Sequence, residues 1–191
     1  MKVVIEPHNP DWATTFLKIR EQLRHTLKDV SIVSIEHVGS TSIPMLKAKP
    51  VLDVDIIVHP PALEVTRRAL AEAHYTDCGE MNVPGRFAFR QPGNARFDAA
   101  HGPGRNGELR YNTYVMIEGC TALRNHLDMK RVLLENPDLR EEYSRVKTEM
   151  QKRDFENIGH YVSGKTEILC KILRTAGWTD EDLRPVVKVN K

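Results

Sequence analysis

The sequence has few cysteines and no long apolar run, and each shortage excludes a class of protein. The three cysteines, Cys78, Cys120 and Cys170, are widely spaced in a chain of 191 residues. This is typical of free thiols in a reducing compartment and not of a disulfide framework or a zinc site. No apolar run approaches the ~20 residues that span a bilayer, and the N-terminus lacks the apolar region of a signal peptide. We therefore expect a cytoplasmic protein without a membrane partner.

A strong charge of either sign is also missing. Lys and Arg number 28 against 26 Asp and Glu, for a net charge of +2; this balance neither requires nor excludes an anionic partner, and we expect no DNA partner. Basic residues recur between Arg124 and Arg153, and again at Lys165, Lys171 and Arg174. Because acidic residues are interleaved with them, most of these charges are expected to solvate helix faces. With 40% apolar residues, the chain is long enough to bury one sizeable core.

Helix and strand patterns alternate in the first part of the chain. Asn9-Pro10 provides an N-cap and a first-turn proline, and apolar residues then repeat at helical spacing from Trp12 to Leu27. The patterns predict strands over 31–38, 51–58, 86–91, 95–100 and 109–118, a helix over 62–74, and a Gly-rich loop over 101–107.

The second part of the chain is predicted to be helical. Helices are expected from Thr121 to a break at Asn136-Pro137, then beyond it, then over about 157–176 with Gly177 as C-cap, and finally from Thr179. This order indicates an α+β fold with a mixed sheet flanked by helices. We expect an α/β core over residues 1–120 and a C-terminal helical region over residues 121–191 packed on it.

Two carboxylates lie in an otherwise apolar predicted strand. Asp53 and Asp55 are two residues apart, so their side chains share one face of the strand. Paired carboxylates repel each other and are costly to bury, so a cation should compensate them. The pattern leaves two alternatives open: a divalent metal site, or a structural ion pair with Arg or Lys at the end of the strand.

A polar turn precedes this strand and follows another. It consists of Gly39, Ser40, Thr41 and Ser42, with Lys47 and Lys49 shortly after it. Backbone N–H groups and hydroxyls in such a turn can hold phosphate oxygens. The alternative is an ordinary Ser-rich loop, but its place one strand before the acid pair favours a binding site.

Together these motifs resemble the GrpB family. The residues that carry the resemblance are Glu36 to Pro44, Lys47 to Pro50, Asp53-Val54-Asp55, His8 to Trp12, Arg124 to Leu127, and the pairs Tyr143 with Lys147 and Tyr161 with Lys165. They extend over nearly the whole chain. The resemblance implies a polymerase-β-type nucleotidyltransferase fold.

In that superfamily the Gly-Ser turn holds nucleotide phosphates and the acid pair binds magnesium. The resemblance therefore implies that Gly39 and Ser40, with Thr41, Ser42 and Lys49 beside them, bind phosphate. It implies that Asp53 and Asp55 are catalytic residues that ligate Mg²⁺, in nucleotidyl transfer to a small acceptor. A third acid on a later strand is usual. This chain has Asn112 and Tyr114 there, with Glu118 at a poor position for the role.

A second branch that this chain resembles makes arginine-containing cyclodipeptides from aminoacyl-tRNAs. In this alternative Asp53, Asp55 and Glu36 would hold the guanidinium group of an arginyl-tRNA without a metal. The basic residues of 124–153 would contact the tRNA backbone. The missing third acid favours this alternative, whereas the fold favours nucleotidyl transfer.

Several further residues are candidates for the site. His37 and His126 are possible general bases, although a histidine beside a Gly turn is often structural. Tyr161 and Lys165 lie four residues apart, so on one helix they could both reach a substrate, with packing as the alternative. The chain also departs from the family pattern, since Met45 replaces a usual glycine and Lys130-Arg131 replaces a usual Arg-Asp.

Overall fold

The computed structural model describes residues 2–93, 109–156 and 158–189. Its helices are α1 (Asp11–Thr26), α2 (Leu63–Glu72), α3 (Thr121–Glu135), α4 (Pro137–Gln151), α5 (Ile158–Ser163), α6 (Thr166–Thr175) and α7 (Asp180–Val189), with short 3-10 turns at Ser40–Ser42 and Pro60–Ala62. Its strands are β1 (Ser34–Val38), β2 (Val51–Val58), β3 (Thr76–Asp77), β4 (Arg86–Arg90) and β5 (Arg110–Ile117). None of the described helices is long and apolar enough to cross a membrane.

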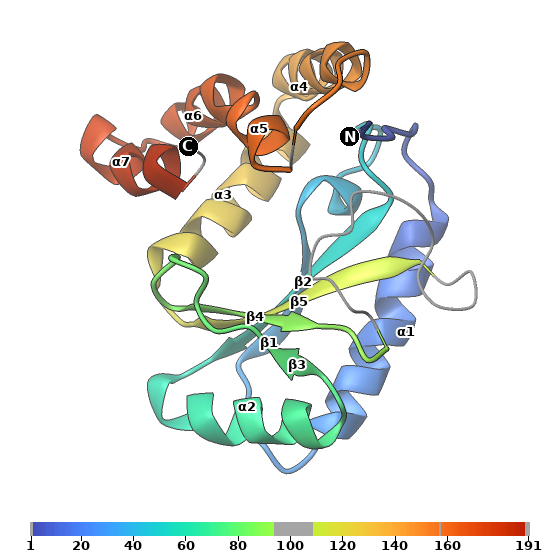
Figure 1. Ribbon diagram of the computed structural model, residues 1–191. Helices are drawn as coiled ribbons and strands as arrows, with labels where there is room; N and C mark the ends of the chain where they lie inside the picture. The colour runs from blue at the N-terminus through green and yellow to red at the C-terminus, as the bar shows by residue number, and fades with distance from the viewer. Residues whose placement is uncertain (1, 94–108, 157, 190–191) are drawn as a thin grey trace.

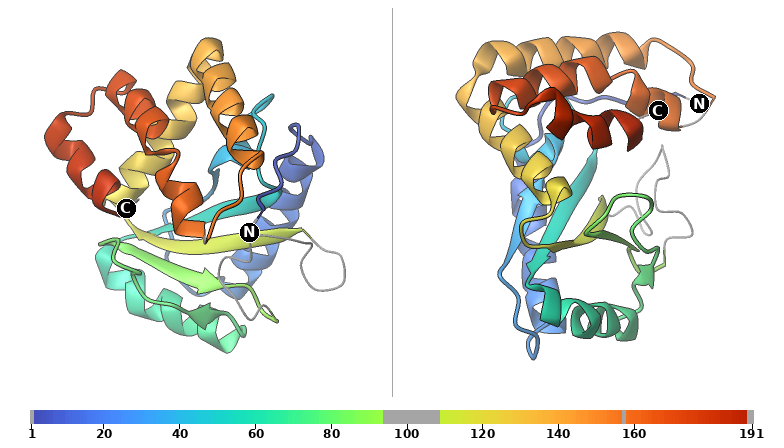
Figure 2. Two further views of the ribbon diagram at one scale, coloured as in Figure 1. Left: turned by 45° about the horizontal axis from the view of Figure 1, so that its top comes forward. Right: turned by 90° about the vertical axis from the view of Figure 1, so that its left-hand side faces the viewer.

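The five strands form one mixed sheet in the order β1-β2-β5-β4-β3. The central strands β2 and β5 are parallel, and the other neighbours are antiparallel. Helices α1 and α2 cover one face, whereas α3 begins on the other face and α4 to α7 pack around it (Figures 1 and 2). The predicted α+β fold with a mixed sheet flanked by helices is confirmed.

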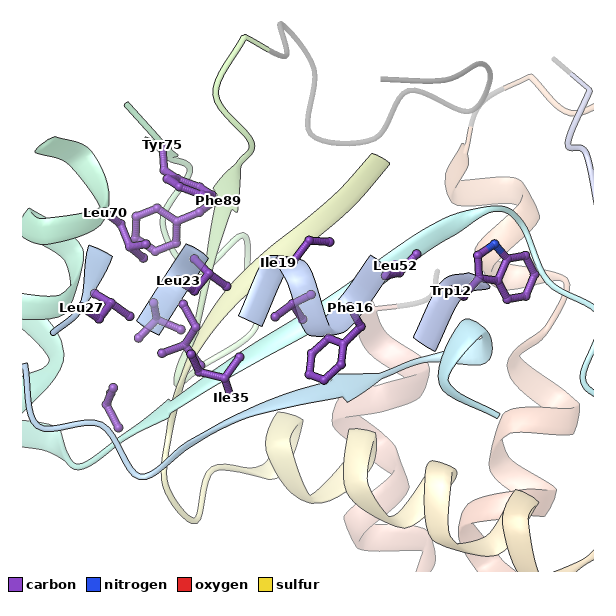
Figure 3. Close-up of a cluster of buried hydrophobic side chains, with 14 of the residues drawn as sticks. Trp12, Phe16, Ile19, Leu23, Leu27, Ile35, Leu52, Leu70, Tyr75 and Phe89 are labelled. Carbon is purple, nitrogen blue, oxygen red and sulfur yellow. The ribbon is translucent and has the colours of Figure 1, made fainter. Parts of the chain in front are cut away.

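The main core lies between α1, α2 and the sheet. Trp12, Phe16, Ile19 and Leu23 repeat along one face of α1 and are buried, as their spacing predicts. They pack on the side chains of β2 that alternate with the acid pair, among them Leu52 (Figure 3). Because the apolar half of β2 is committed to this core, Asp53 and Asp55 face the C-terminal helices.

The single helix predicted over 157–176 is wrong. The chain forms α5 and α6, separated by a turn at Gly164 and Lys165, where the N–H of Lys165 donates to the carbonyl of Val162 over 3.1 Å. A Cβ at Gly164 would meet the end of the Met150 side chain, so the chain packs closely on α4 at this turn. The strand and loop predicted over 95–100 and 101–107 lie outside the described residues.

Candidate functional site

The acid pair of β2 lies in the middle of the sheet. Asp53 is opposite Asn112 of β5, and Asp55 is opposite Tyr114. On the other side, Glu36 of β1 is opposite Asp55, so Glu36 belongs to the same row and the same face. The positions on β5 beside the pair therefore hold an amide and a phenol, as the sequence predicts.

Asp53 is in contact with neutral donors. Its Oδ1 accepts a hydrogen bond of 3.0 Å from Nδ2 of Asn112. Burial raises the pKa of Asp53, and the Asn112 hydrogen bond and the charges of His126 and Lys49 oppose this rise without cancelling it. The carboxylate form of Asp53 is thus destabilised by its surroundings, which is the condition that a bound cation would relieve.

Asp55 has a cation of its own. It is fully buried, and its Oδ2 lies 2.8 Å from Nδ1 of His126 on α3. Burial acts to lower the pKa of His126, but the carboxylates of Asp55 and Asp53 outweigh it and raise that pKa. The partner of Asp55 is therefore a histidine whose protonated form the two carboxylates favour, and not the Arg or Lys of the ion-pair alternative. Oδ1 of Asp55 is buried without a hydrogen-bond partner among the described residues.

The turn after β1 approaches Asp53 closely. Gly39 has φ +68° and ψ −173°, a backbone conformation essentially restricted to glycine. A Cβ at this position would overlap Oδ2 of Asp53. Gly39 is thus required both by its conformation and by the space that Asp53 occupies.

The three hydroxyls of the turn have different environments. Ser42 donates to the carbonyl of Gly39 over 2.7 Å, and Thr41 is buried with its Oγ1 3.0 Å from Nε2 of His37. Both hydroxyls have hydrogen-bond partners within the protein, and their role in phosphate binding stays a prediction. Ser40 alone of the three lines the cavity described below.

His37 is directed away from the acid pair. Because side chains alternate along β1, it packs on α1, stacked on Phe16 with ring centroids 4.9 Å apart. Burial, with Lys130 and His8 nearby, lowers its pKa to about 4. It is therefore neutral at pH 7, and its Nε2 contacts the Thr41 hydroxyl. This position, away from the acid pair, does not suit the predicted role as a general base.

Sequence reasoning missed the role of a buried lysine. Lys147 of α4 is 2% exposed, and its Nζ donates to Oγ of Ser40 over 3.0 Å. The same Nζ lies 4.0 Å from the centroid of the Tyr143 ring. Burial and the charge of Lys165 lower the pKa of Lys147 well below its ordinary value. The spacing of Tyr143 and Lys147, four residues apart, was the available signal.

A second lysine-tyrosine pair lies beside it. Nζ of Lys165 is 4.2 Å from the centroid of the Tyr161 ring. Tyr161 is 3% exposed and packs with Val3, Ile5 and Met150. The pair spans the turn between α5 and α6 and not one helix, so the predicted shared helix face is wrong. Lys165 lines the cavity, whereas the Tyr161 ring does not and packs against the ammonium group of Lys165.

A cavity of about 1050 Å³ lies beside these groups. Ser40, Asp53 and Lys165 line it, whereas Lys147 and Asp55 are buried behind the lining residues. Its lining includes Gly39, Ser40, Asp53, Glu80, Arg86, His126, Lys130, Tyr143, Lys165, Arg184 and Lys188. Cations outnumber acids among these residues. Of the other predicted site residues, Lys49 is close enough to lower the pKa of Asp53. Glu36 is opposite Asp55 in the register of β1 and is not among the residues that line the cavity. Glu118 pairs with His59 over 2.8 Å beyond the end of β5.

Met45 follows the turn and has φ +65°. This left-handed conformation is one that glycine adopts without strain, in keeping with the glycine that the resemblance implies at this position. The Met45 side chain is 77% exposed.

Comparisons with known proteins identify the family. The family profile described as "GrpB protein" matches residues 2–175, and the chain belongs to the GrpB family. The UPF0157 protein YqkA of Bacillus subtilis is 29% identical over 167 residues, which are 87% of this chain and 45% of YqkA. The chain thus spans less than half the length of that relative.

Solved structures extend the comparison. The crystal structure of the conserved protein GrpB from Enterococcus faecalis aligns with a TM-score of 0.72 and 22% identity, over 95% of this chain and 98% of that chain. The two proteins share a fold. The Cid1 poly(U) polymerase aligns more loosely, with a TM-score of 0.43 and 12% identity over 75% of this chain and 43% of that chain, and a similarity at this level says nothing about activity.

Proposed function

We propose that this chain is a transferase that binds a nucleotide in the cavity over β2 and transfers its nucleotidyl group to a small acceptor. The observation that carries the proposal is the buried ammonium group of Lys147 beside Ser40. Its hydrogen bond goes to a neutral hydroxyl, and no ion pair with it is found within the described residues. A buried cation of this kind is destabilised unless an anion joins it.

A phosphate group suits this position. Lys147 and Lys165 are close enough for one to lower the pKa of the other, and a phosphate between them would reverse that unfavourable interaction. Ser40 adds a hydroxyl, and Lys130 lines the same cavity. The tyrosine rings under both ammonium groups hold them in position by cation–π contact.

The acid pair fits one magnesium ion held together with phosphate. Mg²⁺ is usually bound through one or two carboxylates and the oxygens of substrate phosphates. Oδ1 of Asp55 is a buried oxygen without a partner among the described residues, and Asp53 lines the cavity. No cluster of three or more acid, His or Cys side chains suited to a metal occurs in the described chain. When bound, the ion would neutralise charge on the phosphates.

The residues around the cavity would then have separate roles. Lys147, Lys165 and Ser40 would bind and orient the phosphates next to Asp53, and His126 would hold the Asp55 side chain in position. Positioning of this kind, with charge neutralisation, supplies most of the catalysis in phosphoryl and nucleotidyl transfer.

One observation favours the alternative, an arginyl-tRNA-dependent synthesis of cyclodipeptides. Glu36 lies opposite Asp55 and on the same face of the sheet as Asp53, so three carboxylates are available for a guanidinium group. His126 already occupies one oxygen of Asp55, which leaves fewer acceptors for such a ligand. We therefore favour nucleotidyl transfer over cyclodipeptide synthesis.

Calorimetric titration with ATP and Mg²⁺ tests the proposal. We expect Lys147→Met to weaken binding about 10- to 100-fold, the value of a charge-assisted hydrogen bond, and Ser40→Ala to weaken it less. Lys18→Met is the control, since Lys18 is exposed on α1, on the other face of the sheet.

Equal affinity for ATP in the parent and in Lys147→Met would contradict the proposal. A chelator should also abolish any transfer. If the chain instead binds arginyl-tRNA better than other charged tRNAs and a chelator leaves that binding unchanged, the alternative is correct.

A further inference from the structure

Helix α7 contributes to the cavity from outside the family match. The GrpB profile ends at residue 175, whereas α7 begins at Asp180. Four residues of α7 line the cavity: Arg184, Pro185, Val186 and Lys188. This helix therefore reaches the site from beyond the residues that the profile matches.

The position of α7 is fixed by several contacts. Nε1 of Trp178 donates to Oδ2 of Asp128 on α3 over 2.8 Å, and Trp178 packs with Leu183. Asp182 pairs with Arg124 over 3.0 Å and forms a capping box with Thr179, as its spacing predicts. In Figures 1 and 2, α7 lies beside α6 at the start of α3. It is thus anchored to the helix that also carries His126.

The charges on α7 fall into two groups. Arg124 and Arg174 nearby each pair with an acid of α7. Arg184 and Lys188 are exposed, lie four residues apart and so share one helix face. Neither has a hydrogen bond or ion pair within the part of the chain that the structure describes. The face of α7 that borders the cavity is therefore positively charged and uncompensated.

We propose that Arg184 and Lys188 bind a second anionic group of the ligand whose first phosphate lies at Ser40 and Lys147. This inference rests on the proposed function and narrows the ligand to a polyphosphate chain, such as that of a nucleoside triphosphate. A single phosphate held by Ser40, Lys147 and Lys165 leaves the α7 cations without a partner. A longer phosphate chain in the same cavity has enough negative charge to pair with Lys147 and Lys165 at one end and with Arg184 and Lys188 at the other.

Two probes of different length test this assignment. Inorganic phosphate and tripolyphosphate are titrated calorimetrically into the full chain, its Arg184→Gln/Lys188→Gln variant and its Lys147→Met variant, all at one ionic strength. The control is Lys18→Gln/Arg68→Gln, which removes the same charge from exposed positions on α1 and α2. Because Arg184 and Lys188 are exposed, the fold should survive, and circular dichroism checks that it does.

We expect the α7 variant to bind tripolyphosphate about 3- to 30-fold more weakly, as two exposed charge pairs would give. Its affinity for inorganic phosphate should change less than about twofold, and the control should resemble the parent. Equal loss for both probes, or no loss for either, would overturn the assignment. If Lys147→Met weakens both probes while the α7 variant weakens neither, the proposed function stands and this inference fails. If Lys147→Met weakens neither probe, both fail.

Discussion

Replacing Gly39 by alanine tests the turn on which the site depends. The backbone of Gly39 has φ +68° and ψ −173°, and a residue other than glycine pays about 1–3 kcal/mol for such a conformation. An added Cβ would also lie 3.2 Å from Cβ and Cγ of Asp53 and overlap its Oδ2. Asp53 must then move, which breaks its 3.0 Å hydrogen bond with Asn112 and costs about 1 kcal/mol more.

A second glycine separates the two effects. Gly119 has φ +80° and open space around an added Cβ, so Gly119→Ala should show strain alone. We expect denaturant unfolding to give a loss about 1–2 kcal/mol larger for Gly39→Ala than for Gly119→Ala. In Gly39→Ala/Asp53→Ala the clash is relieved, and the combined loss should be smaller than the sum of the single losses. If Gly39→Ala matches Gly119→Ala and binds phosphate like the parent, the close approach of turn and acid is not required.

Two further predictions concern stability. Because the pKa of His37 falls from its ordinary 6.5 to about 4 in the folded chain, the unfolded chain binds a proton first as the pH drops. Stability should fall by about 3 kcal/mol between pH 6.5 and pH 4, and His37→Gln should flatten this slope in pH-dependent unfolding; an unchanged slope would contradict it. Asp53→Asn should raise the melting temperature, because burial disfavours the charged Asp53, whereas Asp55→Asn should cost about 3 kcal/mol by leaving His126 unpaired; equal effects would contradict that pairing.

Local patterns predicted the elements and the orientation of the acid pair. Alternation along β2 is a property of neighbouring residues, so the shared face of Asp53 and Asp55 follows from their spacing alone. The hydrogen bonds of the Thr41 and Ser42 hydroxyls do not follow from spacing, because they depend on the path of the backbone around the turn. The Lys147–Ser40 contact joins residues that are 107 positions apart, and only the packing of α4 over the sheet brings them together.

The acid end and the lysine end of the cavity differ in how strongly they attract a ligand of opposite charge. Under the proposed function, this difference decides how Mg²⁺ and the nucleotide bind. At the acid end, His126 pairs with one oxygen of Asp55, so fewer carboxylate oxygens remain for a free metal ion and the attraction for it is reduced. At the lysine end, Lys147 has only neutral partners among the described residues, so no internal carboxylate competes with a phosphate there. A phosphate bound there would bring negative oxygens to Asp53 and strengthen metal binding, and the metal would strengthen phosphate binding by the same factor. The nucleotide and Mg²⁺ are thus expected to bind together, with the anion providing the larger part of the affinity.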